Sequence, residues 1–392
     1  MGDHSEIVAG GTPNTGHPEY WNPKEIPWMS SGEINNKVIY STDNMISKIG
    51  FSNSSAKWVK EKSVLIALAG QGKTRGTVAI SEIPLTTNQS IAAIQPDSFL
   101  YYKFLFQNLE ERYNELREVS SGDGTRGGLN KQIISDLEVL APEIQEQIKI
   151  GDFLCGIDTL ITLHQRKYDK LTKVKKAMLE KMFPENGSPY SEIRFKGFTD
   201  AWEQRKFSEL TEIRSASRVH KEEWQSSGVP FYRSSDVMAA LNGTENEKAF
   251  ISEELYEKLS AVSGKLEKGD ILVTGGGSVG KPYIVPNNEP LYTKDADLLW
   301  VKNNEKLVPY FIYTFFFSPA FSDYLNSVSH VGTIAHYTIT QLEETPITLP
   351  CVSEQQKIGD YFRNIDSLIT LHQRKLEKLK NIKKACLEKM FV

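Results

Sequence analysis

The chain contains one segment twice, and this repeat constrains its fold more than any other feature. Residues 146–183 and 354–391 align without a gap at an offset of 208, and 26 of the 38 aligned positions are identical. Both copies contain the run Leu-Ile-Thr-Leu-His-Gln-Arg-Lys, and both close on Leu-Glu-Lys-Met-Phe. The segments before the two copies match only loosely. The pattern therefore predicts two variable globular domains, each followed by a copy of one fixed element.

The repeated element has the pattern of a long helix. Apolar residues recur in steps of three and four, from Ile150 to Met182 in the first copy, with Phe153 among them, and from Ile358 to Met390 in the second. This spacing is typical of a helix that buries one face, and it lies near the period of a coiled coil. At ~1.5 Å per residue such a helix would be about 57 Å long. Because one helix cannot bury its stripe alone, we expect the two copies to pair with each other.

A polar residue interrupts the stripe at the same position in both copies, as His164 and His372. Two interpretations are open: a metal site or proton switch, and a polar residue that fixes the register of the pair. The second is favoured because neither histidine has another His or an acidic residue three or four positions later. We expect helix pairing and subunit docking to involve Ile157, Ile161, His164, Leu171, Ile365, Ile369, His372 and Leu379.

The charge distribution excludes a broadly basic nucleic-acid-binding protein. The formal net charge is −4, and the two repeats carry +3 and +4, so −4 less +7 leaves −11 on the remaining residues. Any nucleic-acid surface must therefore be a local patch, or a partner must supply much of the phosphate contact.

The sequence also limits the compartment. No uninterrupted apolar run approaches the ~18 residues of a membrane span, and the start of the chain lacks the pattern of a signal peptide. The three cysteines, Cys155, Cys351 and Cys386, are odd in number and have no Cys-x-x-Cys spacing. We therefore expect a cytoplasmic protein with neither a disulfide framework nor a zinc site.

The segments outside the repeats predict two α/β domains of the α+β type. Strand-like runs in the first lie at 63–68, 76–80 and 90–94, before a helix-like stretch at 99–118. The second repeats this plan, with strands near 230–233, 270–274, 283–285 and 297–301 and a helix near 308–328. We divide the chain into head one (1–142), stem one (143–185), head two (186–350) and stem two (351–392).

Two glycine-rich loops match phosphate-binding loops only in part. Residues Gly275–Lys281 fit Gly-x-x-x-x-Gly-Lys, but Pro282 follows where such a loop needs Ser or Thr and the start of a helix. The loop at Gly70–Gly76 contains Gly-Lys-Thr, but Ala67 stands where the first Gly is required. We interpret both as strand–turn–strand loops that place basic side chains beside backbone amides able to meet a phosphate or a base edge. Since the chain contains no other catalytic constellation, it is interpreted as a binding and scaffolding protein.

The heads and stems together resemble a known family. Both stems contain Glu-Gln-x-Lys-Ile near their start and Leu-Ile-Thr-Leu-His-Gln-Arg-Lys further on, and Phe198–Lys206 leads into head two. These features are similar, over nearly the whole chain, to the specificity subunits of Type I restriction–modification systems. No counterpart of the entry segment Phe195–Lys206 precedes head one, which leaves the packing of head one's first strand open.

The resemblance implies a fold and a function. Each head would be a target recognition domain that reads one half of a split double-stranded DNA site. The stems would pair antiparallel as a coiled-coil spacer and dock two adenine methyltransferase (M) subunits, which translocating endonuclease (R) subunits join. The chain itself would be non-catalytic, with S-adenosylmethionine, ATP and Mg²⁺ bound by those partners. A coiled-coil adaptor without DNA readout, and a nucleotide-binding enzyme built on the second glycine loop, remain as alternatives.

We expect DNA contacts from loop and strand-end residues of both heads. Arg or Lys suits guanine, and Gln or Asn suits adenine. An exposed solubilising charge is the alternative interpretation for each of them. The expected residues are Gln71, Lys73, Thr74, Arg75 and Arg126 in head one, and Arg233, Ser278, Lys281, Lys294 and His336 in head two.

Overall fold

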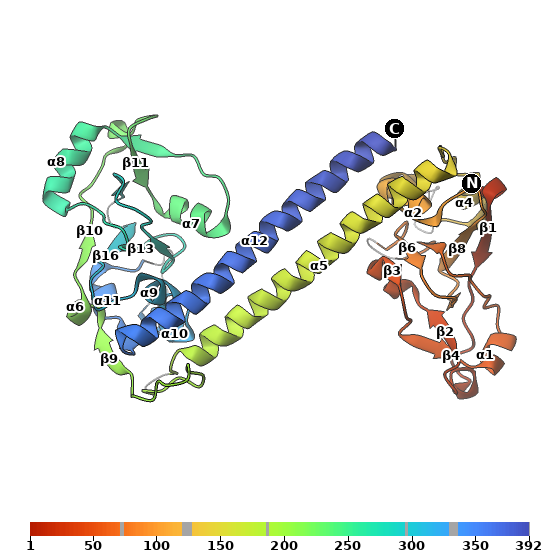
Figure 1. Ribbon diagram of the computed structural model, residues 1–392, viewed down its shortest axis with the longest axis horizontal. Coiled ribbons are helices and arrows are strands. Elements are labelled where there is room, and N and C mark those ends of the chain that lie inside the picture. Colours follow the sequence, from red (N-terminus) through yellow and green to blue (C-terminus); the bar gives the residue numbers. More distant parts are fainter. Residues whose placement is uncertain (71–73, 120–127, 186–187, 295–296, 329–335, 392) are drawn as a thin grey trace. The chain divides into compact units, whose positions relative to one another are not determined.

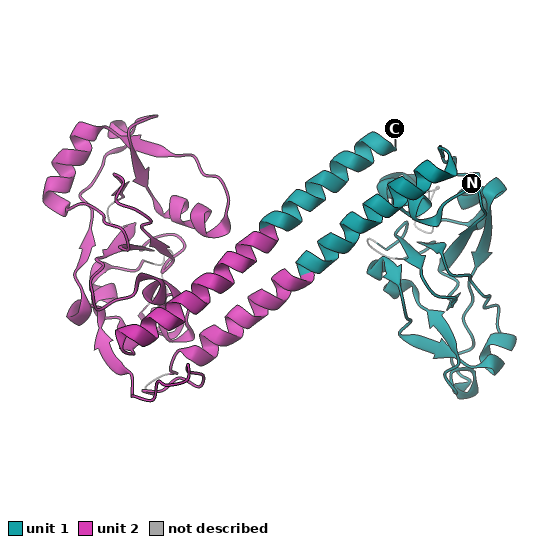
Figure 2. Ribbon diagram, in the orientation of Figure 1, with its two compact units in different colours: residues 1–165, 374–392 teal, residues 166–373 magenta. Residues whose placement is uncertain are grey.

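The computed structural model describes residues 1–70, 74–119, 128–185, 188–294, 297–328 and 336–391. The chain divides into two compact units, shown in Figure 2: unit 1 comprises Met1–Gln165 and Arg374–Val392, and unit 2 comprises Arg166–Gln373. Both divisions fall after the same glutamine of the repeat, so each unit contains one head and a part of each stem. Within the described residues, no helix combines the length and apolar character needed to cross a membrane.

The two stems are single long helices, as predicted. They are α5 (Ile144–Met182) and α12 (Val352–Met390), each of 39 residues. In unit 1 the first part of α5 lies beside the last part of α12, and in unit 2 the last part of α5 lies beside the first part of α12 (Figure 2). The helices therefore run antiparallel within each unit.

The exposed positions of the stems correct the expected stripe. Phe153 is 50% exposed, and Ile382 and Met390 are exposed as well. The prediction that these three residues belong to the buried stripe was therefore wrong. In unit 1 the buried face of α5 follows Leu154 and Ile157, and Phe153 lies one position, or about 100°, away from it around the helix.

Head one is built on a five-stranded sheet covered on both faces. Val64 and Ile66 belong to the core on one face and Leu65 and Ala67 to the core on the other, because successive side chains of a strand alternate. The strand order is β1 (Ser5–Ala9), β8 (Ile91–Pro96), β5 (Ser63–Ala67), β6 (Val78–Ser81) and β3 (Val38–Ile39), antiparallel except for the parallel pair β3–β6. The packing of the first strand, left open by the sequence, is thus settled: β1 pairs with β8.

A smaller sheet and short helices complete head one (Figure 1). The sheet has the order β4 (Asn44–Ile46), β2 (Ile26–Met29) and β7 (Thr86–Thr87), with β7 parallel to β2. The helices are α1 (Lys48–Ser52), α2 (Tyr102–Glu111), α3 (Tyr113–Val119) and α4 (Lys131–Asp136), with 3₁₀ turns at Gly2–His4, Pro18–Tyr20 and Ser31–Asn36. Aromatic residues of α2 pack onto the large sheet, among them Phe104.

Head two repeats this plan with additions. Its described residues form three sheets. The first has the order β10 (Ile213–Ser215), β16 (Leu298–Val301), β13 (Ile271–Thr274) and β14 (Pro282–Ile284). The second has the order β12 (Ala249–Ile251), β11 (Val229–Tyr232) and β15 (Tyr292–Thr293), and the third pairs β17 (Pro346–Leu349) with β9 (Glu203–Lys206). In both heads a three-stranded sheet has one antiparallel and one parallel neighbour around its central strand. The shared arrangement confirms that the heads are two versions of one domain.

The helices of head two are α6 (Phe207–Leu210), α7 (Ser234–Asn242), α8 (Glu253–Ser263), α9 (Pro309–Phe315), α10 (Pro319–Val328) and α11 (Ile339–Glu343), with a 3₁₀ turn at Lys221–Glu223. The single helix expected at 308–328 is two helices, because the ring of Pro319 suits the start of a helix and not its interior. The Ser318 hydroxyl accepts a hydrogen bond from the amide of Phe321 at 3.3 Å and supports the new start. The stretch at 99–118 is likewise divided, at Arg112.

Candidate nucleic-acid interface

The glycine-rich loop of head two is a turn between the antiparallel strands β13 and β14, so the expected strand–turn–strand arrangement is confirmed. The amide of Lys281 donates to the Thr274 hydroxyl at 2.8 Å, and the amide of Gly280 donates to the Thr274 carbonyl at 2.7 Å. The amide of Gly275 donates to the carbonyl of Asp297 at 2.8 Å. These three amides are bonded inside the head, and the contact of the loop with a phosphate or a base edge stays a prediction.

Three further residues of the expected set lie around this loop. Ser278 is exposed within it. The ammonium of Lys294 lies 2.5 Å from Asp297 Oδ2, in the segment that also accepts from the loop. His336 lies beside Gly276, where an added Cβ would be 3.8 Å from His336 Nδ1. The structure therefore brings together Ser278, Lys281, Lys294 and His336.

Lys281 faces the stem helices of unit 2. Its ammonium lies 5.9 Å from the centroid of the Phe317 ring, a contact that holds the side chain by ~0.5–1 kcal/mol at a partly exposed site. It lines a groove of about 710 Å³ whose other wall includes Thr172 of α5 and Gln373 of α12. A groove with both polar and apolar lining residues thus runs beside the loop.

Arg233 lies in a different environment from the rest of the set. Its Nε donates to Asp236 Oδ2 at 3.0 Å, and its guanidinium lies 5.4 Å from the ring of Trp224. A further donation reaches the carbonyl of Glu247. The backbone amide of Arg233 also donates to Asp236 at 2.8 Å, so the two residues together close the start of α7. This capping arrangement gives Arg233 a structural role at the start of α7. The contact of Arg233 with DNA stays a prediction.

The glycine loop of head one joins β5 to β6, at the place that corresponds to the loop of head two. Three of the expected contact residues lie outside the described residues: Gln71, Lys73 and Arg126. Thr74 packs against Gly70, where an added Cβ would be 3.0 Å from Thr74 Cβ. Arg75 is half-buried in the turn that follows. The correspondence of the two loops, inferred from sequence, is confirmed.

A buried glutamine of stem one fixes head one to it. Gln147 is fully buried, and its Nε2 donates to the carbonyls of Phe99 and Pro142 at 3.0 and 2.8 Å. Its Oε1 accepts from the amide of Tyr101 at 2.9 Å. Since Tyr101 immediately precedes α2, this side chain sets where the main helix of head one begins relative to its stem.

Stem two holds head two in the same way. Gln355, at the equivalent repeat position, donates to the carbonyls of Lys306 and Pro350 at 3.2 and 3.0 Å and accepts from the amide of Val308 at 3.1 Å. Val308 immediately precedes α9. Sequence analysis missed both glutamines, although a polar residue kept in both repeats was the available signal.

A glycine one turn further along each stem lets the head helix come close. An added Cβ on Gly151 would lie 2.7 Å from the amide nitrogen of Phe104, and one on Gly359 would lie 3.1 Å from that of Phe311. Any larger residue at Gly151 would push α2 away from the stem. Each stem therefore offers the same joint, made of a buried glutamine and a glycine.

Three of the expected helix-pairing residues pack in a cluster between the two helices, and for the others the role in pairing stays a prediction. In unit 1 Ile157 is buried with Leu154 and Leu387, and Ile161 and Leu379 pack against this cluster. In unit 2 Ile365 is buried, and the remaining members are half-buried: Ile369, Leu171 and His372, as is His164 in unit 1. Among the described residues, no group of three His, Cys, Asp or Glu side chains is arranged to hold a metal ion.

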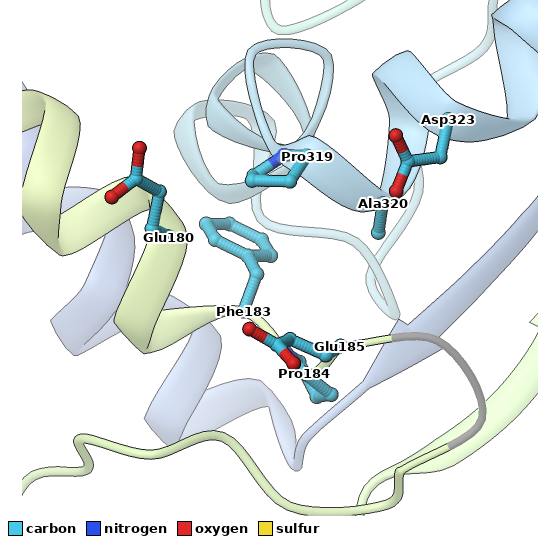
Figure 3. A pocket seen from close by; sticks show the side chains of 7 residues that line it. All are labelled: Glu180, Phe183, Pro184, Glu185, Pro319, Ala320 and Asp323. Atoms are coloured by element: carbon cyan, nitrogen blue, oxygen red, sulfur yellow. The ribbon is translucent and has the colours of Figure 1, made fainter.

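A pocket at the end of stem one has the opposite charge from a DNA site. The pocket has a volume of about 270 Å³. Figure 3 shows its lining side chains, which are three carboxylates and four apolar residues: Glu180, Glu185, Asp323, Phe183, Pro184, Pro319 and Ala320. Carboxylates repel phosphate. The candidate interface is therefore the loop region of each head and not this pocket.

Comparison with known proteins gives the family. The sequence profile described as "Type I restriction modification DNA specificity domain" matches residues 1–173 and 199–381. The MjaIX specificity subunit of Methanocaldococcus jannaschii is 27% identical over 414 aligned residues, covering 99% of this chain and 90% of its own. The MjaVIII specificity subunit of the same organism is 22% identical, covering 88% and 82%. The crystal structure of a Type I restriction–modification S subunit from M. genitalium matches with a TM-score of 0.63 at 13% identity, over 100% of this chain and 94% of that one, so the folds are alike. The chain therefore belongs to the family of Type I restriction–modification DNA specificity subunits.

Proposed function

We propose that each head reads one half of a split DNA sequence, while the stems set the spacing of the halves and dock two methyltransferase subunits. The observation that carries this proposal is the duplicated joint, in which two heads of one plan sit on two copies of one stem through Gln147 and Gln355. A reader of one continuous sequence needs only one such head. Divergent heads on equal joints support two independent half-sites.

We assign the DNA contacts of head two to the cluster Ser278, Lys281, Lys294 and His336, and those of head one to the loop that contains Thr74 and Arg75. Lys294 has a carboxylate partner in the free protein and Lys281 an aromatic one. Both ammonium groups are partly exposed, so exchanging these partners for a phosphate or a guanine edge costs little, about 1 kcal/mol or less each. Because the two loops differ in sequence, they would read different bases.

Docking of M subunits is supported by apolar side chains that the stems leave exposed. Leu160 and Leu163 are 45% and 46% exposed on stem one, and Leu368 and Leu371, at the equivalent positions of stem two, are both 44% exposed. Residues three apart share a helix face, so each stem presents the same leucine pair. Equal apolar patches on both stems favour two copies of one protein partner. The R subunits would join the core that these form.

The chemistry would belong to those partners. The M subunits would flip the adenine out of the duplex and use S-adenosylmethionine, and ATP and Mg²⁺ would serve the R subunits. A nucleotide-binding enzyme built on Gly275–Lys281 is disfavoured because Pro282 opens the strand β14 instead of a helix. A coiled-coil adaptor without DNA readout would not require two large heads of one plan.

The proposal is tested by mapping methylated adenines in cells that carry the chain with its cognate M subunit. We expect one split sequence, methylated in both halves. Replacing residues 1–142 by the first head of a relative should change one half only, because each head meets its stem through its own joint. Methylation of an unsplit sequence, or a change in both halves after the head replacement, would overturn the proposal.

A further inference from the structure

Two ion pairs at equivalent repeat positions connect the stems. In unit 1 the ammonium of Lys383 lies 2.6 and 2.8 Å from the two carboxylate oxygens of Asp158. In unit 2 the ammonium of Lys175 lies 2.6 Å from Asp366 Oδ1. Lys175 and Lys383 are 208 residues apart, as are Asp158 and Asp366. Each unit thus pairs the aspartate of the stem that follows its own head with the lysine of the other stem.

Head one takes part in the pair of unit 1. Lys383 is only 8% exposed, and its ammonium also lies 2.7 Å from Glu110 Oε2. Gln107 donates to Asp158 Oδ2 at 2.7 Å. Both head residues belong to α2, the helix that the buried glutamine fixes to stem one. Head one therefore contacts its own stem through one set of side chains and the other stem through Lys383.

Head two uses different chemistry at the same place. The hydroxyl of Tyr310 donates to Asp366 Oδ2 at 2.9 Å, and the ammonium of Lys175 lies 5.2 Å from the centroid of the Phe317 ring. Phe317 follows Phe311 by six residues, just as Glu110 follows Phe104 by six in head one. Because Phe104 and Phe311 mark the close approach to the stem glycines, Glu110 and Phe317 occupy equivalent positions. The carboxylate of Glu110 thus contacts Lys383 in unit 1, and the aromatic ring of Phe317 contacts Lys175 in unit 2.

Lys383 and Lys175 contact the heads as well as the opposite stem helix. In unit 1 the Glu110 and Asp158 carboxylates lie on one ammonium, and Lys37 neutralises Glu110 from its other side. Removing the Lys383 charge would leave two partly buried carboxylates facing each other, which costs far more than the loss of an exposed pair. Head one would relieve this repulsion by moving away from the stems. The ammonium of the second stem thus holds the head in its place.

We propose that Lys383 and Lys175 are positioning residues for DNA recognition, each fixing one head in its working orientation only when the two stems are paired. The orientation of the heads then determines which spacing between half-sites is accepted. This inference rests on the proposed function, in which each head reads one half-site. The lysines act through Glu110 and Phe317 and do not touch DNA.

The test uses the full chain in complex with its cognate M subunit. The substrates are duplexes that carry the split site found by methylation mapping, with the native spacer or a spacer one base pair shorter or longer. We expect Lys383→Met to lower the preference for the native spacer by about tenfold, which corresponds to ~1.4 kcal/mol, while the half-site bases stay the same. Lys383→Arg should retain the preference. Lys384→Met is the matched control, because the side chain of Lys384 is 77% exposed and its ammonium lies 3.9 Å from Glu388 Oε1, on the same helix.

The spacer preference separates positioning from simple destabilisation. If Lys383→Met slows methylation equally at all three spacers, or leaves all rates unchanged, the positioning role is wrong. If that variant does not fold, Glu110→Gln removes the head side of the contact with little change in size, and the same loss of preference is expected from it. A wild-type complex that methylates no split sequence would overturn the proposed function itself. A split site with an unchanged spacer preference in the variants would overturn only the positioning role.

Discussion

Replacing Gln147 by leucine should destabilise unit 1 strongly. Leucine has nearly the volume of glutamine, so the change removes hydrogen bonds without opening a large cavity. It leaves the amide of Tyr101 and the carbonyls of Phe99 and Pro142 without the partner that each has now. A buried polar group that loses its partner costs ~1–3 kcal/mol, and three such groups give a loss of at least about 3 kcal/mol.

The assay is urea unfolding of the full chain, combined with hydrogen exchange at the amide of Tyr101. A loss of about 3 kcal/mol corresponds to roughly 100-fold faster exchange by local opening, since ~1.4 kcal/mol is a factor of ten. Gln145→Leu is the control, because Gln145 lies on the exposed side of the same turn. Gln355→Leu should reproduce the effect in unit 2. If Gln147→Leu changes stability no more than Gln145→Leu does, the glutamine is not what fixes the head to the stem.

Three further changes test other contacts. Ile161→Asp should lower stability by about 2–4 kcal/mol, because it places a charge in the helix contact; an unchanged urea midpoint would show that Ile161 lies outside it. Burial alone would raise the pKa of Glu110, but the ammonium groups of Lys383 and Lys37 outweigh it and hold that pKa below its ordinary value of 4.5. Stability from this group is therefore present above about pH 4.5 and is lost as the pH falls through the lowered pKa, and Glu110→Gln should remove that part of the acid-side decline in the urea midpoint. Leu160→Glu should weaken M-subunit binding at least about tenfold (~1.4 kcal/mol) in a titration of the complex, without changing the urea midpoint; unchanged binding would place the docking surface elsewhere.

The sequence was most informative where one physical constraint dominates a long stretch. The repeated segments 146–183 and 354–391 agree with the helices α5 and α12 within two residues at each end, because a 39-residue helix must show its period of 3.6 many times over. The glycine loops were predicted as turns because Pro282 follows the loop of head two where a phosphate-binding loop needs Ser or Thr and the start of a helix, and because Ala67 stands where the loop of head one would need its first Gly. The prediction for Phe153 was wrong because the helical periodicity does not fix the buried face to a single position. A residue one position away from that face still fits an apolar spacing of three and four residues.

The joints could not be predicted, because they depend on which residues meet in space. Asp158 and Lys383 are 225 residues apart in the chain, and their pairing follows only from the register of the two helices. Glu354 is almost fully buried in a paired contact with Arg194, at 2.9 and 2.7 Å, whereas the equivalent Glu146 is exposed. Identical residues in the two repeats thus have different environments, which a comparison of the repeats alone cannot reveal.

The joints account for several of the identities between the stems. Leu154 and Phe362 occupy one repeat position, are both fully buried, and differ. Helix packing tolerates such exchanges of apolar residues as long as the volume is accommodated nearby.

The joint residues, by contrast, are the same in both copies: Gln147 and Gln355, Gly151 and Gly359, Asp158 and Asp366, and Lys175 and Lys383. A buried glutamine must match two carbonyls and an amide, and a buried ammonium must match a carboxylate, so small changes of length or polarity leave a group unpaired. Each head needs only a backbone and a few side chains that fit this fixed joint. The rest of its surface, including the glycine loop, is then free to change without disturbing the stems, and a new DNA specificity can arise in one head while the other is retained.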